Sequence, residues 1–297
     1  MRRILQKKRL LFTGISGFLG WHFSRLPLPE WEVHGIVHTH PVRYPGITIH
    51  TVDITDKQMV TALVDAIQPD TIVHAAAYSS PNACEQTPGH SYRVNVESTI
   101  HIATVCFQRN IPLLFTSTDL VFDGDHAPYT EADEPRPINS YGKHKREAEQ
   151  EILQRCPQGL VVRLPLMFGD PGPVATNFFA EMRSSLMYDH PLHLFHDEFR
   201  SMIHGAVAVG GMMTLLGKAS GIYHLGGRER VSRYQFGQLL AKFLGKNSDF
   251  LNPVTQNSVQ MPAARPRDVT LDSSTAYSLG FDPPPLFEQL TENELAH

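Results

Sequence analysis

The sequence has few cysteines and no long apolar run, and each shortage excludes a class of protein. Three of the 297 residues are cysteine, and no set of Cys and His residues has the spacing of a zinc site. The chain therefore predicts neither a disulfide framework nor a structural metal, and it suits a reducing compartment. No apolar run approaches the ~20 residues that span a bilayer. We expect a cytoplasmic protein with no metal site and no membrane partner.

Long blocks of like charge are also missing. The chain carries 26 Lys and Arg residues against 30 Asp and Glu residues, and the formal net charge of -4 is spread along its length. Such a chain lacks the basic surface that attracts nucleic acids, so no nucleic-acid partner is expected. Glycines at positions 14, 17 and 20 interrupt the first apolar stretch, so no export signal is predicted. Small-molecule chemistry is the expected activity.

Short apolar runs alternate with longer amphipathic segments over the first two-thirds of the chain. We expect strands over residues 9–13, 32–38, 47–52, 71–76, 112–117 and 160–164. We expect helices over residues 17–26, 56–67, 91–109 and 140–155. Strands joined by helical crossovers pair in parallel, with helices on both faces of the sheet. The pattern predicts an α/β fold with a doubly wound parallel Rossmann sheet.

The alternation of apolar runs with amphipathic segments ends after residue 169, where proline, histidine and methionine become more frequent. A helix near 205–217, a strand at 222–225 and a helix starting near Ser232 are expected next. A last helix is expected between an Asp272 cap and a Gly280 stop. We therefore predict a nucleotide-binding domain over 1–169, to which 205–225 returns. A smaller C-terminal substrate-binding lobe is predicted over 170–204 and 226–297.

The stretch "LLFTGISGFLG" predicts a dinucleotide site at the end of the first strand. Gly14, Gly17 and Gly20 fall where a strand turns into a helix, which permits a tight turn, a close pyrophosphate and close helix packing. The helix N-terminus would then face the phosphates. A plain tight turn is the alternative. The cofactor-binding residues expected here are Gly14, Ser16, Gly17, Phe18 and Leu19.

The ends of the next strands predict the remaining cofactor contacts. The second strand ends in "GIVHTH" without a carboxylate, and Arg43 follows, which favours a 2′-phosphate over a ribose hydroxyl. NADP(H) is therefore the expected cofactor and NAD(H) the alternative, although the same residues also suit an ordinary polar loop. Further expected contacts are His38, Arg43, Asp53, Ile54, Ala75, Ala76 and Ala77. Asp53 would bind the adenine edge or merely cap the next helix.

Two further motifs contain the candidate catalytic residues. "YGKHK" places Tyr141 and Lys145 four residues apart on one helical face, and "TSTDLVFDG" places Thr118 and Asp119 at the end of a strand. Their order after the glycine turn resembles the extended short-chain dehydrogenase/reductase family. Within it, "STDLVFDG", "NVES", "YGKHK", "RLPLMFG" and "RPRDVTLD" are similar to blocks of dTDP-4-dehydrorhamnose reductases and of the regulatory beta subunit of methionine adenosyltransferase. The resemblance covers nearly the whole chain.

The resemblance implies roles for individual residues. Thr118 would orient the substrate oxygen, Tyr141 would donate the proton, and Lys145 would lower the tyrosine pKa and hold the nicotinamide ribose. Asn95 would support a proton relay, or else be an exposed helix residue. Pro165 is expected beside the cofactor together with Asn95, Tyr141 and Lys145. Substrate contacts are expected from Thr118, Asp119, Arg200 and Arg265, although Arg265 also suits a surface ion pair with Asp268.

At two positions the chain differs from the wider family. One difference bears on the type of reaction, and the other bears on how a dimer would form. Dehydratases carry Asp then Glu after the threonine, whereas Leu120 follows Asp119 here, so we expect reduction or no chemistry rather than elimination. Reductases of this type often carry a glutamate in the first helix for a magnesium-mediated dimer, where this chain has His22. Any homodimer is expected to use apolar faces of helices 91–109 and 140–155.

Two functions therefore remain open at the level of sequence. The Thr118, Tyr141 and Lys145 set favours an NAD(P)H-dependent reductase of a 4-keto deoxysugar nucleotide. The alternative is a non-catalytic, NADP-binding regulatory subunit of a partner enzyme. That alternative rests on the shared blocks and on "DEFR" at 197–200, where the beta subunits also place an arginine.

Overall fold

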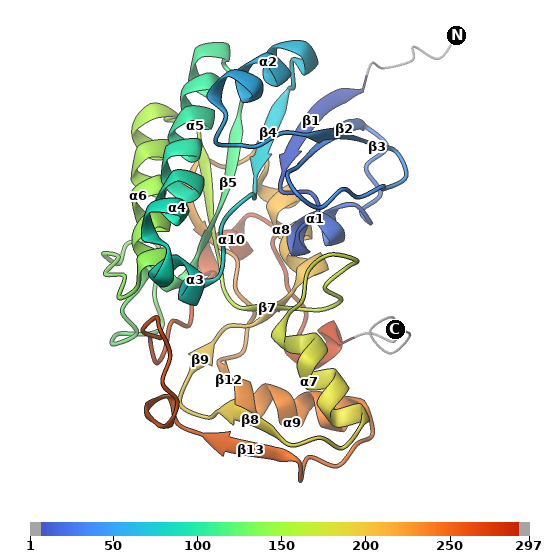
Figure 1. The fold of residues 1–297 in the computed structure, drawn as a ribbon, viewed down its shortest axis with the longest axis vertical. Helices are drawn as coiled ribbons and strands as arrows, with labels where there is room; N and C mark the ends of the chain where they lie inside the picture. The colour runs from blue at the N-terminus through green and yellow to red at the C-terminus, as the bar shows by residue number, and fades with distance from the viewer. Residues whose placement is uncertain (1–6, 291–297) are drawn as a thin grey trace.

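A seven-stranded parallel sheet forms the centre of the computed structural model, which describes residues 7–290 (Figure 1). The strand order is β11-β6-β5-β4-β1-β2-β3, and every neighbouring pair is parallel. The predicted doubly wound α/β fold is confirmed. The strands are β1 (Lys8–Thr13), β2 (Trp31–Val37), β3 (Ile47–Thr51), β4 (Thr71–His74), β5 (Leu113–Thr118), β6 (Leu160–Leu164) and β11 (Gly221–His224).

Helices cover both faces of this sheet because successive strand residues point to opposite sides. Leu10 and Phe12 of β1 pack into one apolar cluster, and Leu11 between them packs into the other. The Leu11 face is covered by α2 (Lys57–Ile67), at the top of Figure 1, and by α5 (Ser98–Arg109) and α6 (Ser140–Arg155), on its left. The opposite face is covered by α1 (Phe18–Phe23), α8 (Gly205–Leu215) and α10 (Ser274–Ser278).

The strand order reverses beside β1, and this position creates the site. From β1 the chain continues to β2 and β3 on one side, and β4, β5 and β6 follow on the other. Crossover connections leave in opposite directions at such a switch point, which opens a crevice at the carboxyl ends of the strands. The short helices α3 (Pro81–Gln86) and α4 (Pro88–Tyr92) and the π-helix η1 (Arg93–Glu97) follow β4 beside this crevice.

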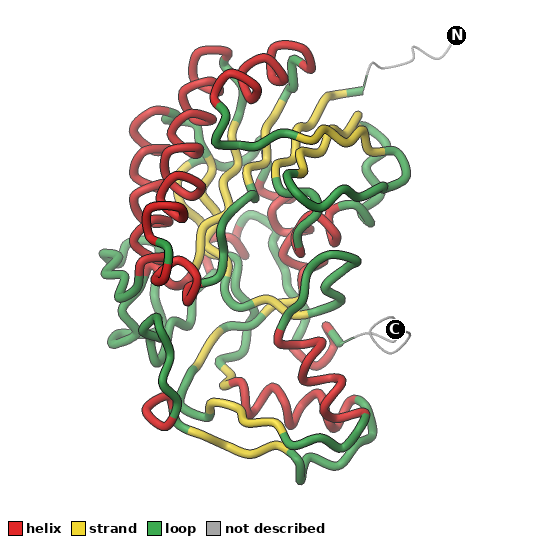
Figure 2. The backbone as a smooth tube through the Cα atoms, in the orientation of Figure 1, coloured by secondary structure: helices red, strands yellow, loops and turns green. Residues whose placement is uncertain are grey.

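The remaining elements form a smaller, loop-rich part, at the bottom of Figure 2. Phe168, Phe179 and Phe236 centre its apolar cluster. Ser232 and Gln235 cap α9 with reciprocal side-chain bonds, as a helix starting near Ser232 requires. The elements of this part are β7 (Met167–Phe168), α7 (Phe178–Met187), β8 (Leu192–Phe195), β9 (Phe199–Arg200), β10 (Ile203–His204), β12 (Val231–Ser232), α9 (Arg233–Phe243), β13 (Leu251–Val254) and the 3-10 helices η3 (Gln256–Ser258) and η4 (Leu286–Gln289).

The last predicted helix is shorter than expected. The residue before α10 is Ser273, which makes no side-chain cap, while Asp272 accepts a hydrogen bond from the Ser274 backbone nitrogen. Gly280 has a φ of +96°, as a helix stop requires. Ala276 of α10 packs with the sheet rather than with the cluster around Phe236. The predicted division into domains stays a prediction, and its ends at 1–6 and 291–297 lie outside the described residues.

The outer surface of α6 differs from the expected apolar dimer face. Its exposed residues are Lys143, Gln150, Gln154 and Arg155. Of α5 and α6, only α5 has a large apolar side chain that is exposed, Phe107 at 61%. The expected homodimer stays a prediction, and α5 offers it more exposed apolar surface than α6. Among the described residues, no helix is long and apolar enough to cross a membrane.

Candidate functional site

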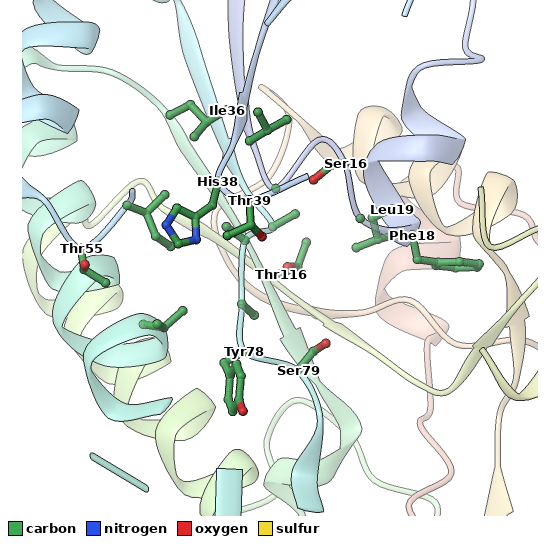
Figure 3. A pocket seen from close by; sticks show the side chains of 18 of the residues that line it. Ser16, Phe18, Leu19, Ile36, His38, Thr39, Thr55, Tyr78, Ser79 and Thr116 are labelled. Atoms are coloured by element: carbon green, nitrogen blue, oxygen red, sulfur yellow. The ribbon is translucent and has the colours of Figure 1, made fainter. Parts of the chain in front are cut away.

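A cavity of about 840 Å³ lies at the carboxyl ends of the central strands (Figure 3). Ser16, Phe18 and Leu19 line one end, and His38, Thr39 and Thr55 line another part of it. Tyr141 and Lys145 line the same cavity from α6. The structure thus brings together thirteen of the residues expected from the sequence: Gly14, Ser16, Gly17, Phe18, Leu19, His38, Asp53, Ile54, Ala75, Ala76, Ala77, Tyr141 and Lys145.

The glycine turn fits a ligand that must approach the backbone closely. Gly14 has a φ of +75°, and a Cβ there would lie 2.8 Å from the Ala76 Cα. A Cβ on Gly20 would lie 2.1 Å from the Ile15 carbonyl oxygen, so α1 packs against β1 only with glycine there. The cradle therefore has the shape expected for a dinucleotide pyrophosphate at the start of α1.

The charged side chains of the cavity favour an anionic ligand. Lys145 and Arg93 line it together with one carboxylate, Asp53, and three histidines, His38, His40 and His90. Asp53 is already engaged, because the Thr55 backbone nitrogen and hydroxyl donate to its Oδ1 atom at 2.9 and 2.8 Å. This surplus of positive charge suits the phosphates of a dinucleotide.

Three expected cofactor contacts lie outside the cavity lining. Arg43 is exposed on the loop after β2, and Pro165 is buried next to Leu164, which lines the cavity in its place. Asn95 is also buried, and its side chain holds the Tyr78 backbone: the Tyr78 nitrogen donates to Oδ1 at 2.8 Å, and Nδ2 donates to the Tyr78 oxygen at 3.0 Å. Asn95 is therefore no exposed helix residue. It positions Tyr78, which lines the cavity.

The N-terminus of α6 is fixed so that Tyr141 and Lys145 face the cavity. The Asn139 side chain accepts from the Gly142 nitrogen at 2.9 Å and caps the helix. A Cβ on Gly142 would lie 2.1 Å from the Leu120 carbonyl oxygen, so only glycine lets this turn pack against the end of β5. The glycine of "YGKHK" is thus a packing requirement of the same site.

Burial controls the protonation of both residues. It raises the pKa of the Tyr141 hydroxyl, and the neighbouring Cys84 and Asp119 act in the same direction. Burial lowers the pKa of Lys145 to about 7, although Glu149 and Cys84 act against that shift. The Lys145 ammonium lies 3.9 Å from the centre of the Phe115 ring. Burial, Cys84 and Asp119 all raise the pKa of Tyr141, so the expectation that Lys145 lowers this pKa is not met.

Thr118 and Asp119 lie behind the cavity rather than in its lining. The Thr118 hydroxyl donates to Asp119 Oδ1 at 3.1 Å and accepts from the Leu120 nitrogen at 3.2 Å, which caps the 3-10 helix η2 (Asp119–Val121). Burial raises the pKa of Asp119 to about 6, and the Arg200 guanidinium partly offsets the effect. Thr116 and Ser117 of the same strand line the cavity instead.

The two expected substrate arginines are both engaged with protein groups. Arg200 is 2% exposed, and its Nε lies 3.3 Å from Asp119 Oδ2 while one terminal nitrogen donates to Glu198 at 2.8 Å. Its other terminal nitrogen donates to the Phe199 carbonyl oxygen at 2.7 Å. Arg265 donates to the Asn82 side chain at 2.9 Å rather than pairing with Asp268. Neither arginine lines the cavity, so a diphosphate clamp stays a prediction.

A buried ion pair supports the helix that carries Tyr141 and Lys145. Glu149, one turn beyond Lys145, accepts two hydrogen bonds from Arg163 of β6 at 2.9 and 2.8 Å. Ser117 of β5 donates to the same carboxylate at 2.5 Å. Glu149 and Arg163 are at most 1% exposed. The pair therefore joins α6 to the two strands that border the site.

Sequence reasoning missed several residues of the cavity. Tyr78 and Ser79 directly follow the "HAAA" segment, so its continuation was a usable signal. His90 and Arg93 come from α4 and η1, whose position depends on packing and has no local sequence signal. The other missed residues are Ile36, Val37, Thr39, His40, Val52, Thr55, Val94, Thr116, Ser117, Leu164 and Met167.

Fold and site together define a nucleotide-binding protein of the short-chain dehydrogenase/reductase type, with Tyr and Lys on one helix beside a glycine turn. The chain belongs to the RmlD substrate binding domain family, whose model matches residues 8–296. It is 32% identical over 291 residues to a probable low-salt glycan biosynthesis reductase of Haloferax volcanii, with 96% of each chain covered.

One further relative and one solved structure complete the comparison. The chain is 27% identical over 284 residues to methionine adenosyltransferase 2 subunit beta of Rattus norvegicus, covering 93% of this chain and 84% of the relative. Its fold is similar to a dTDP-4-dehydrorhamnose reductase of Bacillus anthracis solved in complex with NADP, with a TM-score of 0.86. That likeness has 24% identity and covers 97% of this chain and 99% of the other.

Proposed function

We propose that this chain is an NADP(H)-preferring reductase of a 4-keto deoxysugar nucleotide, with NAD(H) as the weaker alternative cofactor. The observation that carries the proposal is that Tyr141 and Lys145, one turn apart on α6, line the cavity whose other end is the glycine turn. A pure binding scaffold has no physical need for a proton donor beside a lysine there. The reductase name of the Haloferax volcanii relative supports the same reaction class.

The reaction needs a hydride and a proton at one carbonyl group. A nicotinamide coenzyme lying along Gly14 and residues 75–77 would supply the hydride. Tyr141 keeps its proton at neutral pH, so a proton is present for the carbonyl oxygen, although burial raises its pKa and so makes it a weaker acid. The charged form of Lys145 would then stabilise the phenolate that remains. The product is the corresponding alcohol.

The substrate is expected between the nucleotide-binding part and the smaller lobe. In this proposal, residues 170–204 and 226–290 hold the sugar nucleotide, and Thr118, Asp119, Arg200 and Arg265 form the border of its site. Arg200 would have to exchange a protein partner for a phosphate, since each of its nitrogens is engaged. The absence of a carboxylate at position 120 supports reduction over dehydration.

The same engagement of Arg200 favours a second candidate, an NADP-binding regulatory subunit of a partner enzyme. An arginine locked to Asp119 and Glu198 suits a site that takes a cofactor and no substrate. The similarity to methionine adenosyltransferase 2 subunit beta supports this candidate as well. The Tyr141 and Lys145 placement leads us to favour the reductase.

The test combines the purified chain, NADPH and dTDP-4-keto-6-deoxyhexose while the absorbance of reduced nicotinamide is followed. Tyr141→Phe should lower turnover about 100-fold, since it removes the proton donor, and should leave the NADPH dissociation constant nearly unchanged. Equal turnover in the two proteins would remove Tyr141 from the mechanism. Tight NADPH binding without oxidation of any keto-sugar nucleotide would favour the regulatory subunit.

A further inference from the structure

A second cavity, of about 390 Å³, lies beside the loop that joins β11 to β12. Its lining comes from that loop, from residues 270–273, from α10, and from Ala127 and Pro128. It shares no lining residue with the larger cavity that contains Tyr141 and Lys145, and none of the expected substrate contacts lines it. Its volume lies in the range of small-molecule sites. The second cavity is therefore a separate candidate binding site.

Two arginines line this second cavity, Arg228 and Arg230 of the loop after β11. The Arg230 Nε atom donates to Asp268 at 2.5 Å, and the guanidinium carbon lies 3.4 Å from the centre of the Phe199 ring. These contacts fix the guanidinium through one edge and one face. Within residues 7–290, the terminal nitrogens of Arg230 have no hydrogen-bond partner, so they remain for a ligand.

Arg228 is held by contacts that a ligand can replace. Its Nε atom donates to the Pro283 carbonyl oxygen at 2.8 Å, and one terminal nitrogen donates to Asp282. The Arg228 and Asp282 side chains are 44% and 82% exposed, and water screens such a pair strongly. A phosphate group offers a guanidinium two parallel hydrogen bonds, so a phosphate in the cavity can displace the Asp282 carboxylate.

The rest of the lining suits a sugar better than a second phosphate. Asp272 lines the cavity, and the Ser274 backbone nitrogen donates to its Oδ1 atom at 2.8 Å and holds the pKa of this carboxyl below its ordinary value. An ionised carboxylate repels a further phosphate but accepts hydrogen bonds from hydroxyl groups. Pro128 and Leu271 add apolar surface against which the CH groups of a sugar ring can pack.

We propose that this second cavity binds a sugar phosphate, with Arg228 and Arg230 holding the phosphate and Asp272 holding hydroxyl groups of the sugar. A nucleoside diphosphate fits less well, because its second phosphate would approach the Asp272 carboxylate. The site goes beyond the proposed reductase activity and does not depend on it, since the two cavities have no lining residue in common.

Isothermal titration calorimetry tests the site with glucose 1-phosphate, glucose 6-phosphate and ribose 5-phosphate. At least one of them should bind to the unmodified protein, more tightly than inorganic phosphate, and glucose should not bind. Arg228→Gln and Arg230→Gln should each lower the affinity about tenfold or more, the effect of losing one charge-assisted hydrogen bond. Asp282→Asn should raise the affinity, because it removes the carboxylate that competes for Arg228.

Arg155→Gln is the matched control. Arg155 is 43% exposed and pairs with Glu151, much as Arg228 is 44% exposed and pairs with Asp282, but it lies outside the second cavity. This variant should bind the sugar phosphate as the unmodified protein does. NADPH should not compete with the sugar phosphate, and its own affinity should be the same in Arg228→Gln, because that residue lies outside the larger cavity.

Four results would overturn the inference. They are no binding of any of the three sugar phosphates, unchanged affinity in both Arg228→Gln and Arg230→Gln, inorganic phosphate binding as tightly as every sugar phosphate, and competition with NADPH. Failure of NADPH to bind, with sugar-phosphate binding that still depends on the two arginines, would contradict the proposed function and leave the second site established.

Discussion

The buried ion pair between Glu149 and Arg163 leads to a prediction about what stabilises α6, the helix that carries Tyr141 and Lys145. Glu149→Gln removes the carboxylate charge but keeps the shape of the side chain. It leaves the Arg163 guanidinium, which is 1% exposed, without its anion. Removing one partner of a buried pair costs about 3–5 kcal/mol, since the remaining charge is neither solvated nor paired. For a chain of this size the melting temperature should fall by about 10 °C.

A second glutamate on the same helix provides the control. Glu151 pairs with Arg155 at 2.6 Å, but these side chains are 24% and 43% exposed. Glu151→Gln should therefore cost at most about 1 kcal/mol, because exposed pairs are screened by water. Thermal unfolding followed by circular dichroism measures both variants. Equal melting temperatures for Glu149→Gln and Glu151→Gln would refute the reasoning.

The double variant Glu149→Met and Arg163→Met separates the charge from the packing. Replacing both partners with apolar side chains removes the uncompensated guanidinium, so stability should return most of the way to that of the unmodified protein. A double variant as unstable as Glu149→Gln would show that the uncompensated Arg163 guanidinium does not carry the effect.

The remaining predictions concern Gly142 and Lys145 of the same helix, with Gly89 of α4 as a control. Gly142→Ala would place a Cβ 2.1 Å from the Leu120 carbonyl oxygen, so we expect a loss of about 3 kcal/mol or more with loss of activity. Gly89→Ala, with no atom within 4 Å of its Cβ, should be nearly neutral in the same unfolding assay. Lys145→Met should weaken NADPH binding and turnover together. The pKa of Lys145 falls from 10.5 to about 7 on folding, so burial of its charge destabilises the protein fully below pH 7, and the cost disappears as the pH rises toward 10.5. Lys145→Met should accordingly exceed the unmodified protein in stability near pH 6, and this advantage should shrink toward pH 10; an advantage that grew with pH would contradict the assignment.

Local requirements were predictable from the sequence. The glycine turn depends on backbone conformation at Gly14 and on a close approach at Gly20, and both follow from neighbouring residues. Tyr141 and Lys145 share a helical face by spacing alone. The alternation of apolar runs with helical segments was enough for the order of the sheet strands and their helices, because most strands of this sheet are followed by a helical crossover.

Long-range pairings could not be predicted. Arg200 is held by Asp119, 81 positions earlier in the chain (200 minus 119), and no local pattern indicates that contact. His90 and Arg93 reach the cavity through two short helical segments whose direction is set by packing. Proximity in sequence was misleading for Arg43, because the loop after β2 carries that side chain into solvent while His38 stays in the cavity.

The central claim is that this chain transfers a hydride from NADPH to a keto sugar, and the fate of that hydrogen tests it most directly. NADPH that carries deuterium at both positions of the nicotinamide C4 is incubated with the chain and dTDP-4-keto-6-deoxyhexose, and the mass of the sugar product is measured by mass spectrometry. The account predicts a reduced sugar nucleotide heavier by one mass unit, formed by the unmodified protein and far more slowly by Tyr141→Phe. Bound NADPH that never transfers its deuterium to this or any other keto-sugar nucleotide would contradict it.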